Sequence, residues 1–413
     1  MNRGNRRSFL VKSGVTAGGI IGLAGCLGGD SDAIQLGAIN PLSGSAAAYG
    51  ELATETQGAW VDRVNENGGL EVGDSTREVE IVEYDDESSN DQAQSAAQRL
   101  ATVDNVSMIL SSWRSNGAIA INPTINSNQI PTFTHGFTPQ VNEDGTYMLR
   151  LTVSTVMDAY PALQLVSESD DIDTVGVIAE EGDWGDDTLD LMEWWFETDG
   201  NPGSYENLGR FSFDQQDFSS FITSARNSGV DALYVQTWAS AMQRFILQQN
   251  REGLNDDMPI LTGLGGADYN DLGEVGNAME NVHALGVYTR LSYADNEEIR
   301  STISDEALSQ FEEYQEMDTP DHPTAYNVYA DAQAAQYAIE EAGSTDGSDL
   351  REALVDNEFT TILGNATIND KGQPAIPAAY IKFGTDDDEA IVDTVEWSGQ
   401  LPAITSIPPE VDL

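Results

Sequence analysis

Hydroxyl and aromatic side chains recur in this chain at points where a predicted strand gives way to a helix. Ser115 and Thr138 follow two strands of the first half, and Trp184 and Trp238 follow two strands of the second half. Backbone N–H groups at a helix N-terminus attract anionic or carbonyl groups, and tryptophan adds a large apolar surface with one N–H donor. These residues predict reversible binding of a small molecule, although the hydroxyls could instead cap the helices and the tryptophans could belong to the core.

Two further polar residues lie in the same stretches. Arg114 is unusual in so acidic a chain. It could pair with an anionic ligand through two parallel hydrogen bonds, or equally form a surface ion pair. His135 belongs to the loop that ends at Thr138 and could face the same site.

No residue pattern in the chain predicts catalysis or a metal centre. The three histidines are scattered and make no zinc pattern, and the acids at 85–87 lack the spacing of a calcium loop. The glycines at 263–266 do not form a dinucleotide fingerprint. No nucleophile elbow or Ser/His/Asp arrangement is visible. We therefore expect no catalytic residue, no metal and no cofactor, and a protein that is not an enzyme.

The stretch 34–69 indicates how such residues are positioned. Residues 34–39 are mostly apolar, as in a buried strand, and a Ser/Gly loop at 43–45 precedes an amphipathic helix that ends at Gly68 and Gly69. Similar strand–helix pairs recur in two series joined near 151–153. Such repetition predicts parallel sheets covered by helices on both faces. The predicted fold class is α/β, with two doubly wound parallel-sheet lobes.

Composition limits the partners and the environment. The chain has 413 residues, typical of two domains, and carries 70 acidic against 18 basic residues for a net charge of −52. Lysine occurs only at positions 12, 371 and 382. Nucleic acid is an unsuitable partner because phosphate binding needs basic patches. The residue usage resembles that of extreme halophiles, pointing to a haloarchaeal source and a surface adapted to high salt; an acidic mesophilic protein is the alternative.

The first 32 residues read as a leader and a tether. Residues 6–12 (RRSFLVK) resemble a twin-arginine export signal, and residues 23–26 (LAGC) resemble a lipobox in which Cys26 is lipidated. Cys26 is the only cysteine of the chain, so it cannot form an internal disulfide. We expect residues 1–25 to be a signal peptide and 26–32 a flexible tether. An uncleaved anchor is the alternative.

Several motifs resemble one family, the extracellular substrate-binding proteins of ABC importers of the branched-chain amino acid and amide type. These leucine-binding-protein-like chains are periplasmic binding proteins of type I. The resemblance rests on GAINPLSG at 37–44 with Tyr49 and Gly50, NENGG at 65–69 and EYDD at 83–86. It covers about 34–383. It implies two α/β lobes joined by a three-strand hinge, with ligand bound in the cleft between them and captured by hinge closure.

The resemblance also implies which residues contact the ligand. Ser115 matches the serine that holds a carboxylate. In the loop 134–138, Thr138 matches a hydroxyl position and Phe137 a position that contributes backbone. Trp184 and Trp238 match two aromatic positions of the second lobe. The full implied set is Tyr49, Ser115, Phe137, Thr138, Trp184 and Trp238.

One position departs from the family pattern. Amino-acid binders of this family place an acid opposite the ligand ammonium, in a loop that here reads TGLGGAD at 262–268. Gly265 falls about where that acid should be, and Asp268 could substitute for it. Because a buried ammonium without an anion is unfavourable, a carboxylate or amide that lacks a free α-amine is favoured as ligand.

The resemblance divides the chain as follows. Lobe 1 is expected to comprise 33–153 and 288–360, and lobe 2 to comprise 154–287 and 361–413. The expected function is capture of a branched-chain amino acid, amide or small carboxylate and its delivery to an ABC permease. We expect a lipid-anchored monomer on the outer face of the cytoplasmic membrane. An extracellular ligand sensor or a hydrolase on a similar two-lobed scaffold is the alternative.

Overall fold

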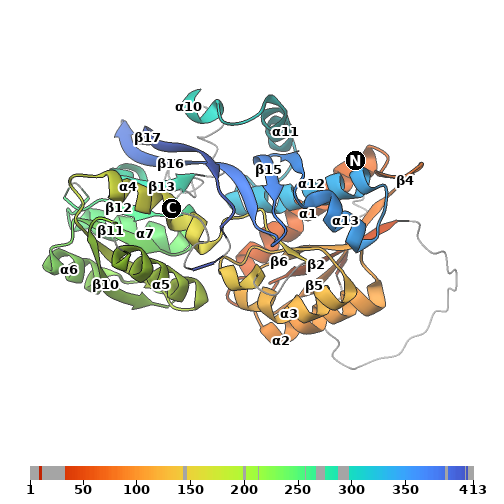
Figure 1. Ribbon diagram of the computed structural model, residues 1–413, viewed down its shortest axis with the longest axis horizontal. Coiled ribbons are helices and arrows are strands. Elements are labelled where there is room, and N and C mark those ends of the chain that lie inside the picture. The colour runs from red at the N-terminus through yellow and green to blue at the C-terminus, as the bar shows by residue number, and fades with distance from the viewer. Residues whose placement is uncertain are drawn as a thin grey trace, which may run out of the picture.

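The protein folds into two α/β lobes that lie side by side (Figure 1). The computed structural model describes residues 9–11, 33–142, 147–198, 201–212, 214–255, 257–266, 275–286, 297–386, 389–404 and 406–407. Each lobe is built on a sheet with a parallel core, as the alternating strand and helix signals predict.

Lobe 1 contains a six-stranded parallel sheet with the strand order β1-β5-β2-β6-β7-β8. Its central strands β2 and β5 are buried at nearly every position, and most of their buried side chains are apolar. The strands are β1 (Phe9–Val11), β2 (Ile34–Asn40), β5 (Val79–Asp85), β6 (Met108–Ser112), β7 (Thr132–Phe133) and β8 (Met148–Leu149). A small hairpin, β3 (Leu70–Val72) with β4 (Ser75–Arg77), lies apart from this sheet.

Helices from both ends of the chain cover the sheet of lobe 1. The early helices are α1 (Ala47–Glu66), α2 (Asn90–Arg99), which continues as a π-helical turn at Leu100–Asp104, and α3 (Ser115–Asn128). The late helix α12 (Pro323–Ala342) packs against α1 and β6, and α13 (Gly347–Leu354) packs on α12. In Figure 1 the orange N-terminal helices and the light-blue α12 therefore belong to the same lobe.

The strand β1 differs from the sequence-based expectation. Phe9–Val11 belongs to the segment 1–25 that is expected to be a signal peptide, and it pairs in parallel with β5 at the edge of the sheet. An apolar three-residue segment satisfies the free edge of β5 in this way. The rest of the leader, with Arg6, Arg7 and Cys26, lies outside the described residues, and its removal stays a prediction.

Lobe 2 contains the larger sheet, ordered β10-β9-β11-β12-β13-β16-β15-β14, with β17 paired to β16. Strands β9 to β13 are parallel, and β14 to β17 are joined by antiparallel pairs. The parallel strands are β9 (Thr174–Glu180), β10 (Ser204–Phe211), β11 (Ala232–Gln236), β12 (Ile260–Thr262) and β13 (Val282–Gly286). The others are β14 (Glu358–Thr361), β15 (Gly364–Ile368), β16 (Pro374–Asp386) and β17 (Glu389–Leu401).

The helices of lobe 2 alternate with its strands in the chain. They are α4 (Thr155–Glu168), α5 (Asp183–Glu197), α6 (Ser219–Ser228) and α7 (Ala239–Arg251). Helix α10 (Glu297–Arg300) packs against β17, and helix α11 (Asp305–Gln315) packs against β14 and β15 (Figure 1). Turns of 3₁₀ helix occur at Pro139–Asn142, Leu264–Gly266 and Gly276–Met279. No helix among the described residues is long and apolar enough to span a bilayer.

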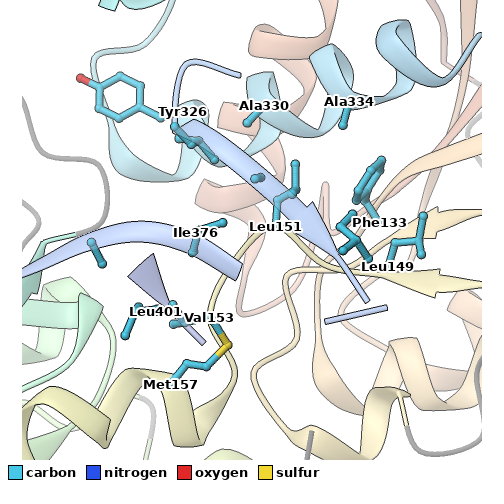
Figure 2. Close-up of a cluster of buried hydrophobic side chains, with 14 of the residues drawn as sticks. Phe133, Leu149, Leu151, Val153, Met157, Tyr326, Ala330, Ala334, Ile376 and Leu401 are labelled. Atoms are coloured by element: carbon cyan, nitrogen blue, oxygen red, sulfur yellow. The ribbon is translucent and has the colours of Figure 1, made fainter. Parts of the chain in front are cut away.

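A continuous apolar core joins the two lobes. Leu149 and Leu151 leave lobe 1, and Val153 and Met157 lead into α4 of lobe 2; all four are essentially buried. Figure 2 shows Leu149 beside Phe133, Leu151 near the middle of the cluster, and Val153 and Met157 near Leu401 of β17. The hinge is therefore packed like a domain interior, which holds the ends of the two sheets opposite one another.

Candidate ligand-binding site

A cavity of about 220 Å³ lies between the lobes. Lobe 1 lines it with residues 45–46, 49, 113–116 and 135–137, and lobe 2 lines it with residues 180–184 and 238. Nearly all of these residues stand directly after a strand or at the start of a helix. This is the edge at which open parallel sheets bind ligands, because the loops there are free to vary while the strands hold them.

Four helices begin at the cavity, two from each lobe. Ala46 precedes α1, Ser115 opens α3, Gly182 precedes α5 and Trp238 precedes α7, and all four residues line the cavity. The first N–H groups of a helix lack intrahelical partners, and the helix dipole is positive at this end. The convergence favours a negatively charged or carbonyl group on the ligand.

Six ring side chains form a continuous seam along the cavity. In lobe 1, His135 stacks on Trp113 with ring centroids 4.4 Å apart, and Trp113 stacks on Tyr49 at 5.6 Å. Tyr49 then contacts Trp238 of lobe 2 at 5.2 Å.

The second part of the seam links Phe137 with Trp184 and Trp238. Phe137 stacks on Trp184 at 4.5 Å and meets Trp238 edge-on at 5.6 Å, while the two tryptophans are 5.3 Å apart. Phe137 belongs to lobe 1 and the tryptophans to lobe 2, so these contacts join the lobes in the closed arrangement. A flat apolar ligand would find π-faces from both sides.

Ser115 and Phe137 are at the cavity, but their roles differ in part from those the resemblance implies. The hydroxyl oxygen of Ser115 accepts hydrogen bonds from the N–H groups of Phe137 at 3.1 Å and Thr138 at 3.4 Å. The hydroxyl proton of Ser115 therefore remains for a ligand. Because its N–H is already donated to Ser115, Phe137 offers its ring to the cavity in place of its backbone.

Thr138 is the one residue of the implied ligand-binding set that does not line the cavity. It is fully buried, and its hydroxyl lowers the pKa of Asp187 on α5. Its carbonyl oxygen accepts a hydrogen bond from Nη2 of Arg150 at 2.9 Å. The structure thus brings Tyr49, Ser115, Phe137, Trp184 and Trp238 to the cavity and places Thr138 behind it, between the lobes.

Arg150 is a fully buried cation that supports this loop. Its Nη1 donates to the carbonyl oxygen of Phe137 at 3.2 Å, beside its bond to Thr138. Burial lowers the pKa of Arg150 to about 9, and the charge of Asp187 opposes that shift. Burial in turn raises the pKa of Asp187 to about 6. The hydrogen bonds of Arg150 therefore fix the backbone of the loop that carries Phe137.

A buried polar network fixes α1 to the strands beneath the cavity. Asn40, at the end of β2, donates to Gln57 of α1 at 3.0 Å and to Glu83 of β5 at 2.7 Å. Ser111 of β6 donates to Asn40 at 2.6 Å and accepts from Gln57 at 3.1 Å. Each member satisfies another, so the start of α1 is held rigidly relative to three strands.

His135 and Arg114 supply the basic groups of the lobe 1 face. Nε2 of His135 lies 3.0 Å from the carboxylate of Asp331 on α12, which is itself buried. Burial raises the pKa of Asp331 to about 6, and His135 opposes that shift. Arg114 donates to Asn90 at 3.1 Å and lowers the pKa of the neighbouring Asp86, which burial raises. Arg114 lines the cavity, so it adds positive charge where α3 begins.

Trp113 and Glu180 are among the cavity residues that sequence reasoning missed. Trp113 follows β6 directly, so the rule that found Trp184 and Trp238 could also have found it. Glu180 is the last residue of β9 and is only 8% exposed, although acids in this chain are expected to face solvent. Its neighbours Glu181 and Gly182 gave no signal that Glu180 is buried.

Gly265 is the position at which the family pattern places an ammonium-binding acid, and the structure leaves no room there for a side chain. A Cβ atom at Gly265 would lie 1.9 Å from the carbonyl oxygen of Thr237, so only glycine fits there. Gly265 does not line the cavity, and Asp268 lies outside the described residues. Within the described part of the chain, no three His, Cys, Asp or Glu side chains are placed to hold a metal ion.

A comparison with known families decides the relationship. A family model described as periplasmic binding protein matches residues 33–386. The chain belongs to the periplasmic binding protein family. This binding protein is 21% identical over 345 residues to the leucine-, isoleucine-, valine-, threonine- and alanine-binding protein of Pseudomonas aeruginosa, covering 83% of this chain and 87% of the relative.

Solved structures show the same two-lobed architecture. A solute-binding protein of an ABC transporter from R. palustris, in complex with 4-hydroxybenzoate, has a TM-score of 0.73 at 20% identity and covers 90% of this chain and 98% of its own. The branched-chain amino acid binding protein LivJ of Streptococcus pneumoniae, in complex with isoleucine, has a TM-score of 0.71 at 17% identity and covers 89% and 99%. At these identities the likeness establishes the fold, and the predicted fold class is confirmed.

Asp158 supports the loop behind Trp238 in this binding protein. Its carboxylate accepts a hydrogen bond from the N–H of Leu264 at 2.8 Å, and the adjacent Gly265 packs against Thr237. Burial raises the pKa of Asp158 to about 7, against that single hydrogen bond. The folded state therefore holds this proton more tightly than the unfolded chain, so stability falls as the pH rises from about 4 to 7 and is then level.

We expect Asp158→Asn to remove the loss of stability that the buried carboxylate causes at high pH, because the amide oxygen still accepts the hydrogen bond from Leu264 and carries no charge. Relative to the wild type, the free energy of unfolding of the variant should rise by roughly 2–3 kcal/mol between pH 5 and pH 8. Urea unfolding at both pH values and constant salt measures the difference. The exposed Asp62→Asn is the control. A difference between Asp158→Asn and wild type that does not change with pH would contradict the assignment.

Proposed function

We propose that this binding protein is a lipid-anchored extracellular receptor that captures a small carboxylate or amide by hinge closure and delivers it to the permease of an ABC importer. The observation that carries the proposal is the cavity on which four helix N-termini converge from two lobes. Relatives that bind isoleucine or 4-hydroxybenzoate support it, since both of those ligands carry a carboxylate.

The two faces of the cavity differ in charge, which orients the ligand. Lobe 1 offers Arg114, the Ser115 hydroxyl and the starts of α1 and α3, all suited to a carboxylate or amide carbonyl. Lobe 2 offers acidic residues together with Trp184 and Trp238. The apolar body of the ligand then lies between rings of both lobes. Because Gly265 leaves no space for an acid, an aromatic or other carboxylate without an α-amine is favoured over a free amino acid.

Closure requires no covalent chemistry. When the lobes meet, ring contacts such as the stack of Phe137 on Trp184 form across the cleft. A ligand that contacts both faces adds to these contacts only in the closed form, so its binding energy shifts the hinge equilibrium towards closure.

A hydrolase is the alternative function, and one observation about the residues at the cavity favours it. Ser115, His135 and Asp331 have the residue types of a hydrolytic triad, and His135 is paired with Asp331. However, the Ser115 oxygen accepts two backbone N–H groups, and within the described residues no hydrogen bond joins it to His135. A nucleophile needs a base within hydrogen-bonding reach. Release of nitrophenol from a nitrophenyl ester, abolished by Ser115→Ala, would favour the hydrolase.

The ligand assignment is tested by Ser115→Ala. We expect the wild type to bind benzoate or benzamide more tightly than leucine, and the variant to lose about 1–2 kcal/mol of binding free energy with one hydrogen bond to a polar end group. Titration calorimetry measures both, with thermal unfolding as a check on folding. The exposed Ser95→Ala on α2 should leave binding unchanged. Tight binding of leucine without binding of either aromatic probe would sink the proposed ligand class.

The anchor is tested by Cys26→Ser. We expect the variant to be released into the medium, since it lacks the thiol that carries a diacyl group; a single chain binds membranes only marginally. Ser31→Ala in the tether is the control. Replacing Arg6 and Arg7 by lysine should stop export, whereas Arg3→Lys should not. Cys26→Ser protein that stays in the membrane fraction without detergent would rule out the lipobox.

The acidic surface is proposed to be an adaptation to high salt, because 70 acidic residues repel one another unless ions screen them. We expect the thermal midpoint to rise steadily from dilute buffer to molar potassium chloride. Sucrose of matched osmolality controls for general solvent exclusion and should reproduce only part of the rise. The same midpoint in dilute buffer and in molar salt would contradict this adaptation.

A further inference from the structure

Glu180 is a buried acid at the ligand cavity whose role the proposed mechanism has not used. It is the last residue of β9, lines the cavity from lobe 2 and is 8% exposed. One oxygen of its carboxylate accepts a hydrogen bond from the hydroxyl of Thr237 at 3.0 Å. The side chain is thus held in one orientation beside the cavity.

The backbone of Glu180 is held just as firmly. Its N–H donates to the side chain of Gln236 at 3.3 Å, and its carbonyl oxygen accepts from Nη2 of Arg210 at 3.1 Å. A Cβ atom at position 185 would lie 1.8 Å from the same carbonyl, so Gly185 lets α5 approach this closely. Such an arrangement is typical of a preorganised binding residue.

The carboxylate of Glu180 has no cationic partner among the described residues. The ion pair of Arg210 is with Asp186, and Arg210 meets Glu180 only through the backbone carbonyl. Burial raises the pKa of Glu180 to about 7, and the hydrogen bond from Thr237 only partly opposes this. A buried carboxylate without a counter-ion is unfavourable, and a hydrogen-bond donor on a ligand would relieve it.

A purely structural role is a poor explanation for this acid. The buried acid Asp158, by contrast, accepts a hydrogen bond from a backbone N–H and does not line the cavity. Of the residues that the structure describes, only Thr237 donates a hydrogen bond to the side chain of Glu180, through its hydroxyl, and a neutral side chain could have accepted that bond. Glu180 also lies on the opposite lobe from Arg114 and Ser115, so it faces the end of the ligand that is away from the carboxylate.

We propose that Glu180 accepts a hydrogen bond from a hydroxyl or amino group at the ligand end opposite the carboxylate, and so selects acids that carry such a donor over those that lack it. The inference rests on the proposed function, since it assigns the second end of the same ligand. A charge-assisted hydrogen bond in a desolvated site is strong enough to discriminate in this way, because the analogue without the donor leaves the acid unpaired.

The test compares benzoate, 4-hydroxybenzoate and 4-aminobenzoate by titration calorimetry at pH 8 in molar salt. We expect the wild type to bind at least one of the substituted acids tenfold or more tightly than benzoate; comparing the two shows whether the donor is a hydroxyl or an amine. In Glu180→Gln, which keeps the shape and removes the charge, the ratio should fall to about threefold or less. Benzoate affinity should stay within about twofold. Glu193→Gln, an exposed acid on α5, is the control for charge alone.

Two results would overturn the inference while leaving the proposed function in place. One is a wild type that binds all three acids equally well. The other is a Glu180→Gln variant that preserves the wild-type ratio or weakens all three acids by the same factor. A wild type that binds none of the three acids overturns the proposed aromatic ligand and the role of Glu180 together. Glu180→Ala provides a second variant in case the amide of glutamine replaces the carboxylate as acceptor.

Discussion

The structure depends on one constraint. Two parallel sheets end at a common cleft, and the polar groups at the ends of their strands must find hydrogen-bond partners there without filling the cleft. In lobe 1 the network of Asn40, Gln57, Glu83 and Ser111 does this within the sheet. At the boundary between the lobes, Arg150 donates hydrogen bonds to two loop carbonyl oxygens. A buried guanidinium is unfavourable unless it is well bonded, and its hydrogen bonds leave the loop little freedom. The shape of the cavity follows from these bonds.

The same arrangement explains why the cavity has two chemically different faces. Helices begin on both sides, but only lobe 1 adds basic side chains, whereas lobe 2 adds acids at the end of β9 and the start of α5. Between these faces lies the aromatic seam from His135 to Trp184. A polar ligand therefore meets attraction at each end and apolar surface along its length. The hinge core around Leu151 and Val153 keeps the two faces in register.

Much of the fold was predictable from the sequence because buried strands such as β2 and β11 consist mainly of apolar residues. The hairpin β16–β17 does not follow from the strand–helix repetition of the sequence, and β17 is only partly buried, so its apolar pattern is weak. In the site, strand ends identified Ser115, Trp184 and Trp238. Sequence could not show that Thr138 lies outside the cavity lining, because its burial depends on packing between segments that are far apart in the chain.

The aromatic seam has a practical consequence for following the protein in solution. Trp184 and Trp238 contact Phe137 and Tyr49 of the other lobe only when the lobes meet, and Trp113 lies one ring further along. Indole emission responds to the polarity and to the ring neighbours of each tryptophan. Opening of the hinge would transfer Trp184 and Trp238 from a stack of rings to water. The chain thus contains two native fluorophores at the boundary between the lobes, so a hinge motion of the kind proposed would change the fluorescence of unlabelled protein.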